Sequence, residues 1–242
     1  MRYAIIAGGE GSRLAKEGVK EPKPLVRIGG ERLIDRLVRV FEDNGAESIV
    51  VAYRDSMFSV AEHLSYLQGR ADGNNGAPVL AIGVETPSSM HSLNCIIGRL
   101  DAGPFCLTTV DTVFGEDAFK RYISAFTASL DGGEADGMMA VTSYIDDEKP
   151  LYVAVDDGMN ITAFLDEDKG CRYVSAGIYG LTPRCADVLR RCIGRGESRM
   201  RNFQRALLSD GMRLKAFDIG RAFDIDHAAD IAKAERFLRD GV

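Results

Sequence analysis

The N-terminal segment decides the fold, and it runs Met1-Arg-Tyr-Ala-Ile-Ile-Ala-Gly-Gly-Glu-Gly-Ser-Arg-Leu14, with Glu21-Pro-Lys-Pro-Leu-Val-Arg-Ile28 a few residues later. Residues 3–7 are apolar and β-prone, which is typical of a strand buried on both faces at the centre of a parallel sheet. The first strand of such a sheet delivers the loop that follows it to the ligand crevice. We therefore expect residues 8–13 to lie at a binding site.

The loop after this strand carries the chemistry of a phosphate site. Gly8, Gly9 and Gly11 have no Cβ, so their backbone can turn tightly and bring N–H groups close to an anion. Arg13 adds a planar, permanently charged fork that suits phosphate oxygens, and Lys23 adds a compact charge between two prolines. The order of these residues predicts a phosphate site.

Two common glycine motifs are excluded. The dinucleotide fingerprint needs a third glycine where Leu14 stands, and no acidic residue ends a second strand at the expected distance. The Walker loop needs Gly-Lys-Ser/Thr after four intervening residues, which this segment lacks.

The segment instead resembles the signature G-x-G-[T/S]-R-L, followed by P-K-P-L, of the nucleotidyltransferases, which include sugar-1-phosphate nucleotidyltransferases and their molybdopterin-cofactor-transferase-like relatives. The matching residues are Gly9-Glu-Gly-Ser-Arg-Leu14 and Pro22-Lys-Pro-Leu25. The resemblance implies that Arg13 and Lys23 are catalytic. The expected nucleotide contacts in this segment are Ala7, Gly8, Gly9, Glu10, Gly11, Ser12, Arg13 and Lys23.

Composition narrows the class of protein. The 242 residues are 45% hydrophobic and 27% charged, an ordinary balance for a soluble protein, and the net charge of −6 argues against a general nucleic-acid surface. No apolar run approaches the roughly 20 residues of a membrane span, so we expect a cytoplasmic protein without membrane contact. The five cysteines include no C-x-x-C pair, and we expect them to be reduced core residues.

Hydrophobic periodicity predicts alternating strands and helices in the first half of the chain. The expected strands are 48–53, 78–84 and 105–110, and the expected helices are 31–44, 56–68 and 116–130, with turn residues at 72–76. From residue 137 the pattern changes to strands at 138–145, 152–155, 161–165 and 173–181, followed by helices at 183–193 and 198–208 and a strand at 213–219.

This order predicts an α/β fold. We expect a Rossmann-like three-layer α/β/α sandwich with a mixed, mostly parallel central sheet, which is the GT-A-like fold of the nucleotidyltransferases that the chain resembles. We also expect a single nucleotidyltransferase domain over residues 1–242, with a nucleotide-binding half at 1–135. The other half, 136–242, is expected to bind the acceptor and to supply the second metal ligand.

The segment after the third strand contains several serines. Ser88 or Ser89 is suited to cap the next helix, whose N-terminus points at the same crevice. In the resembling families this segment contacts the base and ribose, so Ser88, Ser89 and Ser92 are candidate nucleotide contacts. Capping alone explains one of these serines equally well.

Asp111 stands where the buried strand 105–110 reaches the crevice. A carboxylate there is desolvated without a structural partner, and Mg²⁺ supplies one, because it binds hard oxygen ligands together with water and phosphate oxygens. The resembling families carry their first metal-binding aspartate here. The alternative is a cap for the helix that begins at residue 116.

The second half resembles the acceptor-binding part of the same families. Val174-Ser-Ala-Gly-Ile-Tyr179 is similar to their V-N-A-G-I-Y strand, in which Gly177 lets the acceptor phosphate lie against the backbone. Their F-x-E-K-P element is matched only in part here, by Phe164-Leu-Asp-Glu-Asp-Lys169. The resemblance offers Glu167 and Lys169 as acceptor contacts.

A closing motif near the C-terminus completes the resemblance. The residues Phe223-Asp-Ile-Asp-His-Ala-Ala-Asp230 resemble the family's D-I-D/G-T-P-E-D-L, whose first aspartate binds the metal opposite the strand-end one. The metal pair is then Asp111 and Asp224. Asp226 is the competing ligand, and either residue is also suited to cap the last helix.

Together these motifs imply a Mg²⁺-dependent nucleotidyltransferase. It transfers NMP from an NTP to a phosphorylated acceptor, first a sugar-1-phosphate and second a phospho-alcohol such as phosphocholine, and releases pyrophosphate. A glycosyltransferase is a further alternative, although Thr112 and Val113 follow Asp111 where D-x-D is usual. A non-catalytic nucleotide-binding module need not keep Lys23 and two aspartates. The base, the acceptor and the oligomeric state, homo-oligomers included, stay open.

Overall fold

The computed structural model describes residues 1–73 and 76–240. Its central sheet has nine strands, in which β10-β9-β11-β6-β1-β4-β5 form one path and β8 and β12 continue from β11. The strands are β1 (Arg2–Ala7), β4 (Ser48–Arg54), β5 (Val79–Val84), β6 (Phe105–Thr109), β8 (Gly137–Thr142), β9 (Tyr152–Val155), β10 (Ile161–Leu165), β11 (Tyr173–Leu181) and β12 (Leu214–Asp218).

The first strand, β1, lies between two parallel neighbours, β4 and β6. Both of its faces are buried, with Tyr3 and Ile5 in one core cluster and Ala4 and Ile6 in the other, because successive side chains in a strand point to opposite faces. Strands β10 and β11 are antiparallel to the strands with which they pair. Strand β1 is parallel to β4 and β6, β4 is parallel to β5, and β12 is parallel to β8. The sheet is therefore mixed and mostly parallel, as predicted.

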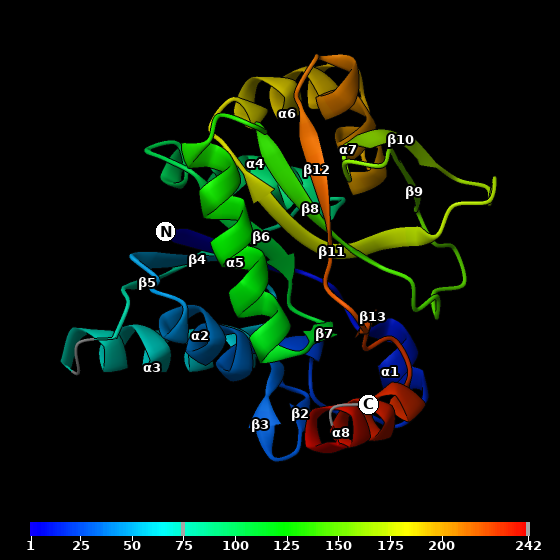
Figure 1. Ribbon diagram of the computed structural model, residues 1–242. Coiled ribbons are helices and arrows are strands. Elements are labelled where there is room, and N and C mark those ends of the chain that lie inside the picture. The colour runs from blue at the N-terminus through cyan, green and yellow to red at the C-terminus, as the bar shows by residue number, and fades with distance from the viewer. Residues whose placement is uncertain (74–75, 241–242) are drawn as a thin grey trace.

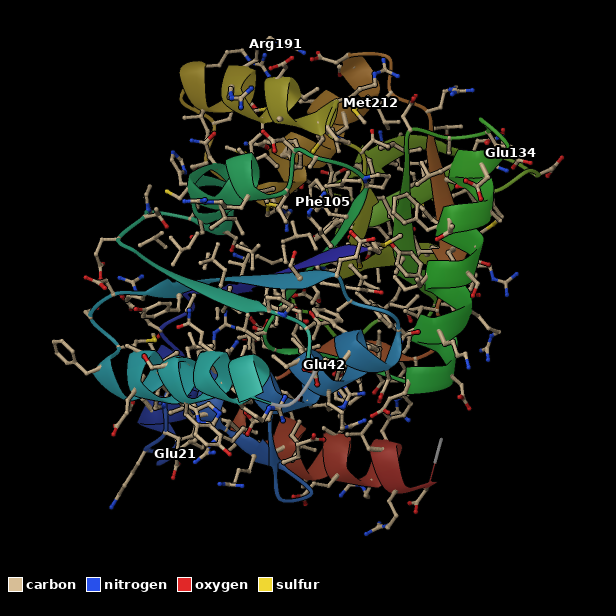
Figure 2. The ribbon with its side chains drawn as sticks, turned by 90° about the vertical axis from the view of Figure 1, so that its left-hand side faces the viewer. Glu21, Glu42, Phe105, Glu134, Arg191 and Met212 are labelled. Carbon is tan, nitrogen blue, oxygen red and sulfur yellow. The ribbon has the colours of Figure 1, made fainter. Side chains whose placement is uncertain are left out.

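Helices cover both faces of this sheet. Figures 1 and 2 show α2 and α3 on one side of the strands and α4 and α6 on the other. The helices on the first side are α2 (Leu33–Asp43), α3 (Phe58–Gly73), α5 (Glu116–Asp131) and α8 (Ala228–Asp240); those on the second are α4 (Ser89–Ile96), α6 (Cys185–Gly194) and α7 (Met200–Ser209). The predicted three-layer sandwich is confirmed.

Some local elements differ from the sequence prediction. The helix expected at 31–44 begins at Leu33, because residues 31 and 32 form β3 (Glu31–Arg32), which pairs with β2 (Arg27–Ile28) across a turn whose two glycines have positive φ. The turn expected at 72–76 is also wrong at its start, since α3 continues to Gly73; residues 74 and 75 lie outside the described residues.

A second two-stranded ribbon was not predicted. Strand β7 (Thr112–Phe114) follows Asp111 directly and pairs antiparallel with β13 (Ala222–Asp224), more than a hundred residues later in the chain. Figure 1 shows this ribbon between the lower end of α5 and α8. The pairing brings the strand-end aspartate and the closing motif together.

In the described parts of the chain, every helix is too short or too polar to cross a bilayer.

Candidate active site

The glycine loop turns sharply at the end of β1. Gly11 has φ +61°, a left-handed conformation that favours glycine, and a Cβ there would lie 3.4 Å from the Cβ of Lys23. Helix α1 (Ser12–Lys16) follows. In the described structure the backbone N–H groups of Gly9, Glu10 and Gly11 donate to no protein acceptor. These groups are therefore available to an anion.

These N–H groups border a cavity of about 320 Å³. Its lining comes from the glycine loop, the end of β5 and the start of α4, and consists of Ile6, Gly8, Gly9, Glu10, Gly11, Ser12, Arg54, Val84, Thr86, Pro87, Ser88, Ser89 and Ser92. The predicted nucleotide segments 8–12 and 88–89 thus meet at one cavity. Ala7 is fully buried as the last residue of β1.

The serines at the start of α4 have separate contacts. Ser88 is the N-cap, and its Oγ accepts a hydrogen bond from the backbone N–H of His91. Ser92 is buried, and its Oγ lies 2.6 Å from the hydroxyl of Thr86. A Cβ on Gly8 would lie 3.8 Å from the same Ser92 oxygen. Capping therefore explains Ser88, while Ser92 packs the helix against the loop.

Arg54, at the end of β4, is a loop contact that the sequence analysis missed. Its Nε donates to the carbonyl oxygen of Gly8 at 3.3 Å, and its Nη1 lies 3.3 Å from Glu10 and 3.5 Å from Glu85. One feature of the sequence could have indicated this role, because Arg54 is the last residue of a strand that pairs with β1. Arg54 ties the glycine loop to the neighbouring strand.

Lys23 is the buried centre of the site. Its Nζ donates to Oδ2 of Asp111 at 2.6 Å and to Oδ1 of Asp226 at 2.7 Å, and only 6% of the residue is exposed. Burial acts to lower the pKa of Lys23, but the charges and hydrogen bonds of the two aspartates outweigh burial and raise the pKa. The ammonium group is therefore charged at neutral pH.

Asp226 also contacts Arg13, whose Nη1 lies 3.1 Å from Oδ2. Burial acts to raise the pKa of Asp226, but its hydrogen bond with Lys23 and the charges of Lys23 and Arg13 lower it overall. Neither Asp226 nor Asp224 caps α8, because their carboxylates bind other side chains and the N–H of Ala228, the first residue of α8, donates to Glu17. Asp226 is therefore an ionised partner of both predicted catalytic cations.

Asp224 lies on the β7–β13 ribbon, where its Oδ1 accepts a 2.9 Å hydrogen bond from Thr112. The residue lines two cavities. Desolvation, followed by the negative charge of Asp111, raises the pKa of Asp224 above its usual range. Asp111 does not cap α5, whose N-cap is Gly115. The three aspartates thus form one electrostatic cluster.

Two further cavities continue from this cluster. One of about 250 Å³ is lined by Arg13, Tyr144, Asp147, Ser175, Asp224 and Asp226, among others. The other, of about 410 Å³, shares Asp147, Ser175 and Asp224 with it and Ser88 and Ser89 with the glycine-loop cavity. We call the two together the acceptor-side cavities. Shared walls therefore join the glycine loop to the aspartate cluster.

Gly177 lines the larger acceptor-side cavity. Its φ is +72°, and a Cβ there would lie 2.9 Å from Oγ1 of Thr112, the hydroxyl that donates to Asp224. The strand β11 changes its register with β8 in this region. Glycine is thus required both by backbone conformation and by the closeness of Thr112.

The other two predicted acceptor residues do not line the acceptor-side cavities. Glu167 lines a neighbouring cavity of about 730 Å³, which shares Lys149, Arg199 and Arg201 with the larger acceptor-side cavity. Lys169 is exposed and lines none of these cavities. Polar residues that the sequence analysis missed line the larger acceptor-side cavity instead: Lys149, Arg199, Arg201 and the buried Gln204, whose Oε1 accepts from Ser175 at 3.3 Å. No local motif marks these positions.

The aspartate cluster has the donor chemistry for a magnesium ion. In residues 1–73 and 76–240, no group of three or more His, Cys, Asp or Glu side chains is arranged to hold a metal by itself. Mg²⁺ in nucleotide sites is usually held by one or two carboxylates together with water and phosphate oxygens. Asp111 and Asp226 already converge on one cation, and their negative charges act on Asp224, whose pKa is raised first by desolvation and then by the charge of Asp111. These residues fit a divalent ion.

Comparison with known proteins gives the class that this site belongs to. Residues 3–210 match the family model of the MobA-like NTP transferase domain. The chain therefore belongs to this nucleotidyltransferase family. The resemblance predicted from the glycine loop, Lys23 and the aspartates is confirmed at the level of the family.

Particular relatives match parts of the chain. A glucose-1-phosphate cytidylyltransferase of Salmonella typhimurium (strain LT2) is 28% identical over 65 residues, which are 27% of this chain and 25% of that protein. A bifunctional IPC transferase and DIPP synthase of Thermococcus kodakarensis is 25% identical over 122 residues, which are 50% of this chain and 26% of that protein. These matches span about a quarter of the length of each relative.

A solved structure supports the fold over nearly the whole chain. The inositol-1-phosphate CTP transferase from T. maritima superposes with a TM-score of 0.78 at 21% identity, covering 98% of both chains. The shared fold extends through the second half, where the sequence motifs are weaker. The likeness therefore supports the three-layer arrangement and the joining of strands from both halves in one sheet.

Proposed function

We propose that this protein transfers a nucleoside monophosphate from an NTP to a phosphorylated acceptor and releases pyrophosphate. One observation carries the proposal: the unpaired N–H groups of Gly9 to Gly11 border a cavity that is joined by shared walls to the Lys23 and aspartate cluster. A triphosphate at the loop would bring its α-phosphate toward Lys23. Membership of the NTP transferase family supports this direction of transfer.

The chemistry needs no general base. The acceptor phosphate is already an anion near neutral pH, so positioning and charge neutralisation carry the catalysis. In this mechanism the glycine loop holds the triphosphate, Arg13 holds the leaving pyrophosphate, and Lys23 stabilises charge on the α-phosphoryl group. Burial acts to lower the pKa of Lys23, but the charges and hydrogen bonds of Asp111 and Asp226 raise it overall, so the side chain that meets the substrate is a cation.

A bound Mg²⁺ would neutralise phosphate charge and orient the two substrates. Asp111 and Asp226 are the carboxylates best suited to hold it, because both already contact one cation. Asp224, the preferred second ligand from the motif, is held by Thr112 and lies within the same charged cluster. We therefore propose Asp111 with Asp226 as the metal pair and keep Asp224 as the alternative.

The chemistry of the acceptor-side cavities favours a polyhydroxylated acceptor over phosphocholine. A quaternary ammonium group binds the faces of aromatic rings. Here the guanidinium of Arg221 lies 4.3 Å from the ring centroid of Tyr144, and the ammonium of Lys233 lies 4.1 Å from that of Phe223. The protein's own cations thus cover these two rings, whereas Asp147, Ser175 and Gln204 offer partners for hydroxyl groups.

The relatives point the same way. They are named as acting on glucose-1-phosphate and inositol-1-phosphate, which are ring polyol phosphates. The phosphate of such an acceptor has nearby cationic partners in Lys149, Arg199 and Arg201, which line the larger acceptor-side cavity. A sugar-1-phosphate therefore remains the first choice of acceptor.

Pyrophosphate release tests the proposal. Purified protein is incubated with Mg²⁺, one of CTP, UTP, dTTP, GTP or ATP, and one of glucose-1-phosphate, inositol-1-phosphate or phosphocholine. We expect release that needs both substrates and one preferred base, with a polyol phosphate as acceptor. Release with phosphocholine alone would reverse the acceptor assignment. No release from any pair, with glycosyl transfer from a nucleotide-sugar instead, would favour the glycosyltransferase; nucleotide binding without turnover would favour the non-catalytic module.

A further inference from the structure

A glutamine interrupts the apolar side of α7. The buried residues of this helix are Phe203, Gln204, Ala206 and Leu207, which share one helical face. Gln204 is only 2% exposed. Burying an amide costs free energy unless its polar atoms are hydrogen-bonded, so an apolar residue would suit this position better. The glutamine therefore indicates a role other than packing.

One of the two polar atoms of the Gln204 amide is held by the protein. Its Oε1 accepts a hydrogen bond from Oγ of Ser175 at 3.3 Å. In the described part of the chain, Nε2 donates to no protein acceptor, and it is not among the buried polar atoms that are sealed off without a partner. Gln204 lines the larger acceptor-side cavity. Its amide nitrogen is therefore open to a molecule that occupies this cavity.

The glutamine meets β11 at a position where the chain departs from the motif V-N-A-G-I-Y. Ser175 stands where that motif has asparagine. This chain thus lacks an amide at this position of the strand and has one on α7 instead, in contact with the hydroxyl of Ser175. Ser175 lines the same cavity. We call these two neutral side chains the Gln204–Ser175 pair.

The helix that carries Gln204 is fixed against the sheet. Arg201 donates to Oδ1 of Asp166 at 2.6 Å, and Nε of Arg205 donates to the carbonyl oxygen of Phe164 at 3.0 Å. Both acceptors belong to β10 or follow it directly, and Figure 1 shows α7 beside this strand. Side chains on rigid elements hold a ligand in one geometry. Gln204 is therefore placed to recognise one particular group of a ligand.

The chemistry of the Gln204–Ser175 pair identifies the group that it recognises. An amide and a hydroxyl are uncharged, and each both donates and accepts hydrogen bonds. A ring hydroxyl does the same, whereas an ionised phosphate only accepts and a trimethylammonium group does neither. The cavity has a volume of about 410 Å³, within the range of small-molecule sites, and Asp224 also lines it. One acceptor in this cavity would thus reach both the aspartate cluster and Gln204.

We propose that Gln204 is a specificity-determining residue, which selects acceptors by a hydrogen bond from its amide to one ring hydroxyl. This inference rests on the proposed function, because it assigns a group on the acceptor side of the same site. It narrows the acceptor to a cyclic polyol phosphate with a hydroxyl at one defined ring position. An acceptor without this hydroxyl leaves the buried amide unpaired and is used less well.

Deoxy acceptors and a glutamine variant test the proposal in one cycle. The measured quantity is kcat/KM for pyrophosphate release by wild type, Gln204→Met and Gln68→Met. The acceptor is glucose-1-phosphate or inositol-1-phosphate, whichever wild type uses, and each of its analogues that lack one ring hydroxyl. Methionine keeps the length of the side chain without the amide. Gln68, on α3, lines none of the cavities described above and controls for the exchange itself.

We expect Gln204→Met to lower kcat/KM for the full acceptor by roughly 10- to 100-fold, the range for leaving one buried hydrogen-bonding group unpaired. With the analogue that lacks the recognised hydroxyl, Gln204→Met should be at least as fast as wild type, because no hydroxyl is then left to pair. Gln68→Met should match wild type throughout. An equal loss with every analogue would assign Gln204 a structural role, and no loss with the full acceptor would exclude it from recognition; either result overturns the proposal.

A binding measurement separates this inference from the proposed function. Calorimetric titration of the same acceptors into the same three proteins, with Mg²⁺ and without NTP, needs no turnover. If wild type releases no pyrophosphate but binds a polyol phosphate roughly 10-fold or more tightly than Gln204→Met, the proposed function fails and recognition by Gln204 stands. If pyrophosphate is released with phosphocholine alone, the transfer stands and the role of Gln204 is refuted. That role is also refuted if wild type neither uses nor binds a polyol phosphate.

Discussion

The Nζ atom of Lys23 lies 2.6 Å from Oδ2 of Asp111, although 88 residues separate them in the chain. Asp226 binds the same ammonium group at 2.7 Å, and Arg13 binds the other oxygen of Asp226. The predicted catalytic cations are thus held by predicted metal-binding carboxylates. The positive charge of Lys23 thus balances the negative charges of Asp111 and Asp226.

Removing this charge should slow the reaction. For Lys23→Ala we expect kcat to fall by roughly 10²–10³, by analogy with the loss of one donor that stabilises transition-state charge. Steady-state pyrophosphate release measures it. The exposed Lys20 provides the control, and Lys20→Ala should keep wild-type turnover. Near wild-type turnover in Lys23→Ala would exclude Lys23 from the mechanism.

The three aspartates can be separated by amide substitution. Asp111→Asn and Asp226→Asn should each lose the extra thermal stabilisation that Mg²⁺ adds to NTP binding, with kcat lowered by about 10² or more, the scale of one lost electrostatic contact. Asp224→Asn should keep that Mg²⁺ effect, because Asp224 contacts Thr112 and not Lys23. The measurement is a thermal shift with NTP, with and without Mg²⁺. If Asp224→Asn loses the Mg²⁺ effect and Asp226→Asn keeps it, the second metal ligand is Asp224 and not Asp226.

Gly177→Ala should destabilise the strand that faces the aspartates. A Cβ would lie 2.9 Å from Oγ1 of Thr112, in addition to the strain of φ +72°. Unfavourable backbone conformations of this kind cost about 1–3 kcal/mol, and each kcal/mol lowers Tm by roughly 2–4 °C in a domain of this size. Gly196→Ala is the control, since φ is +78° there and no atom lies within 4 Å. Equal losses of Tm in both variants would show that Thr112 is not displaced.

Asp136 should make stability depend on pH. Burial acts to raise its pKa, but the backbone N–H and guanidinium of Arg213 and the charge of Arg184 lower it overall. A carboxyl whose folded pKa is depressed stabilises the protein above its unfolded pKa, about 3.9, and this contribution disappears as pH falls through the folded pKa. Asp136→Asn should therefore be less stable than wild type at pH 7 by about 1–3 kcal/mol.

Urea unfolding at several pH values measures this difference. The gap between wild type and Asp136→Asn should narrow steadily below about pH 4, because the wild-type carboxyl becomes neutral there. A gap that stays constant down to pH 2 would mean that Asp136 stabilises the protein through its shape and not its charge.

Much of the fold was predictable from local patterns. The run from Tyr3 to Ala7 marked the central strand, and the glycines after it marked the loop, because burial and tight turning restrict which residues a position accepts. Periodicity likewise located most helices and strands to within a few residues. Family membership followed from the glycine loop, the lysine between prolines and the two aspartate motifs, and it is confirmed. The roles of individual residues remain predictions.

The tertiary structure decided what depends on distant pairing. The contact of Arg54 with Gly8, the ribbon that joins Thr112 to Asp224, and the choice of Asp226 as the partner of Lys23 have no local signature. Periodicity records only whether a position is buried. Which strand ends meet, and therefore which carboxylate reaches a given cation, follows from the sum of many packing contacts between segments far apart in the chain. The sequence by itself determined the chemistry of the site, and the packing of the sheet determined its geometry.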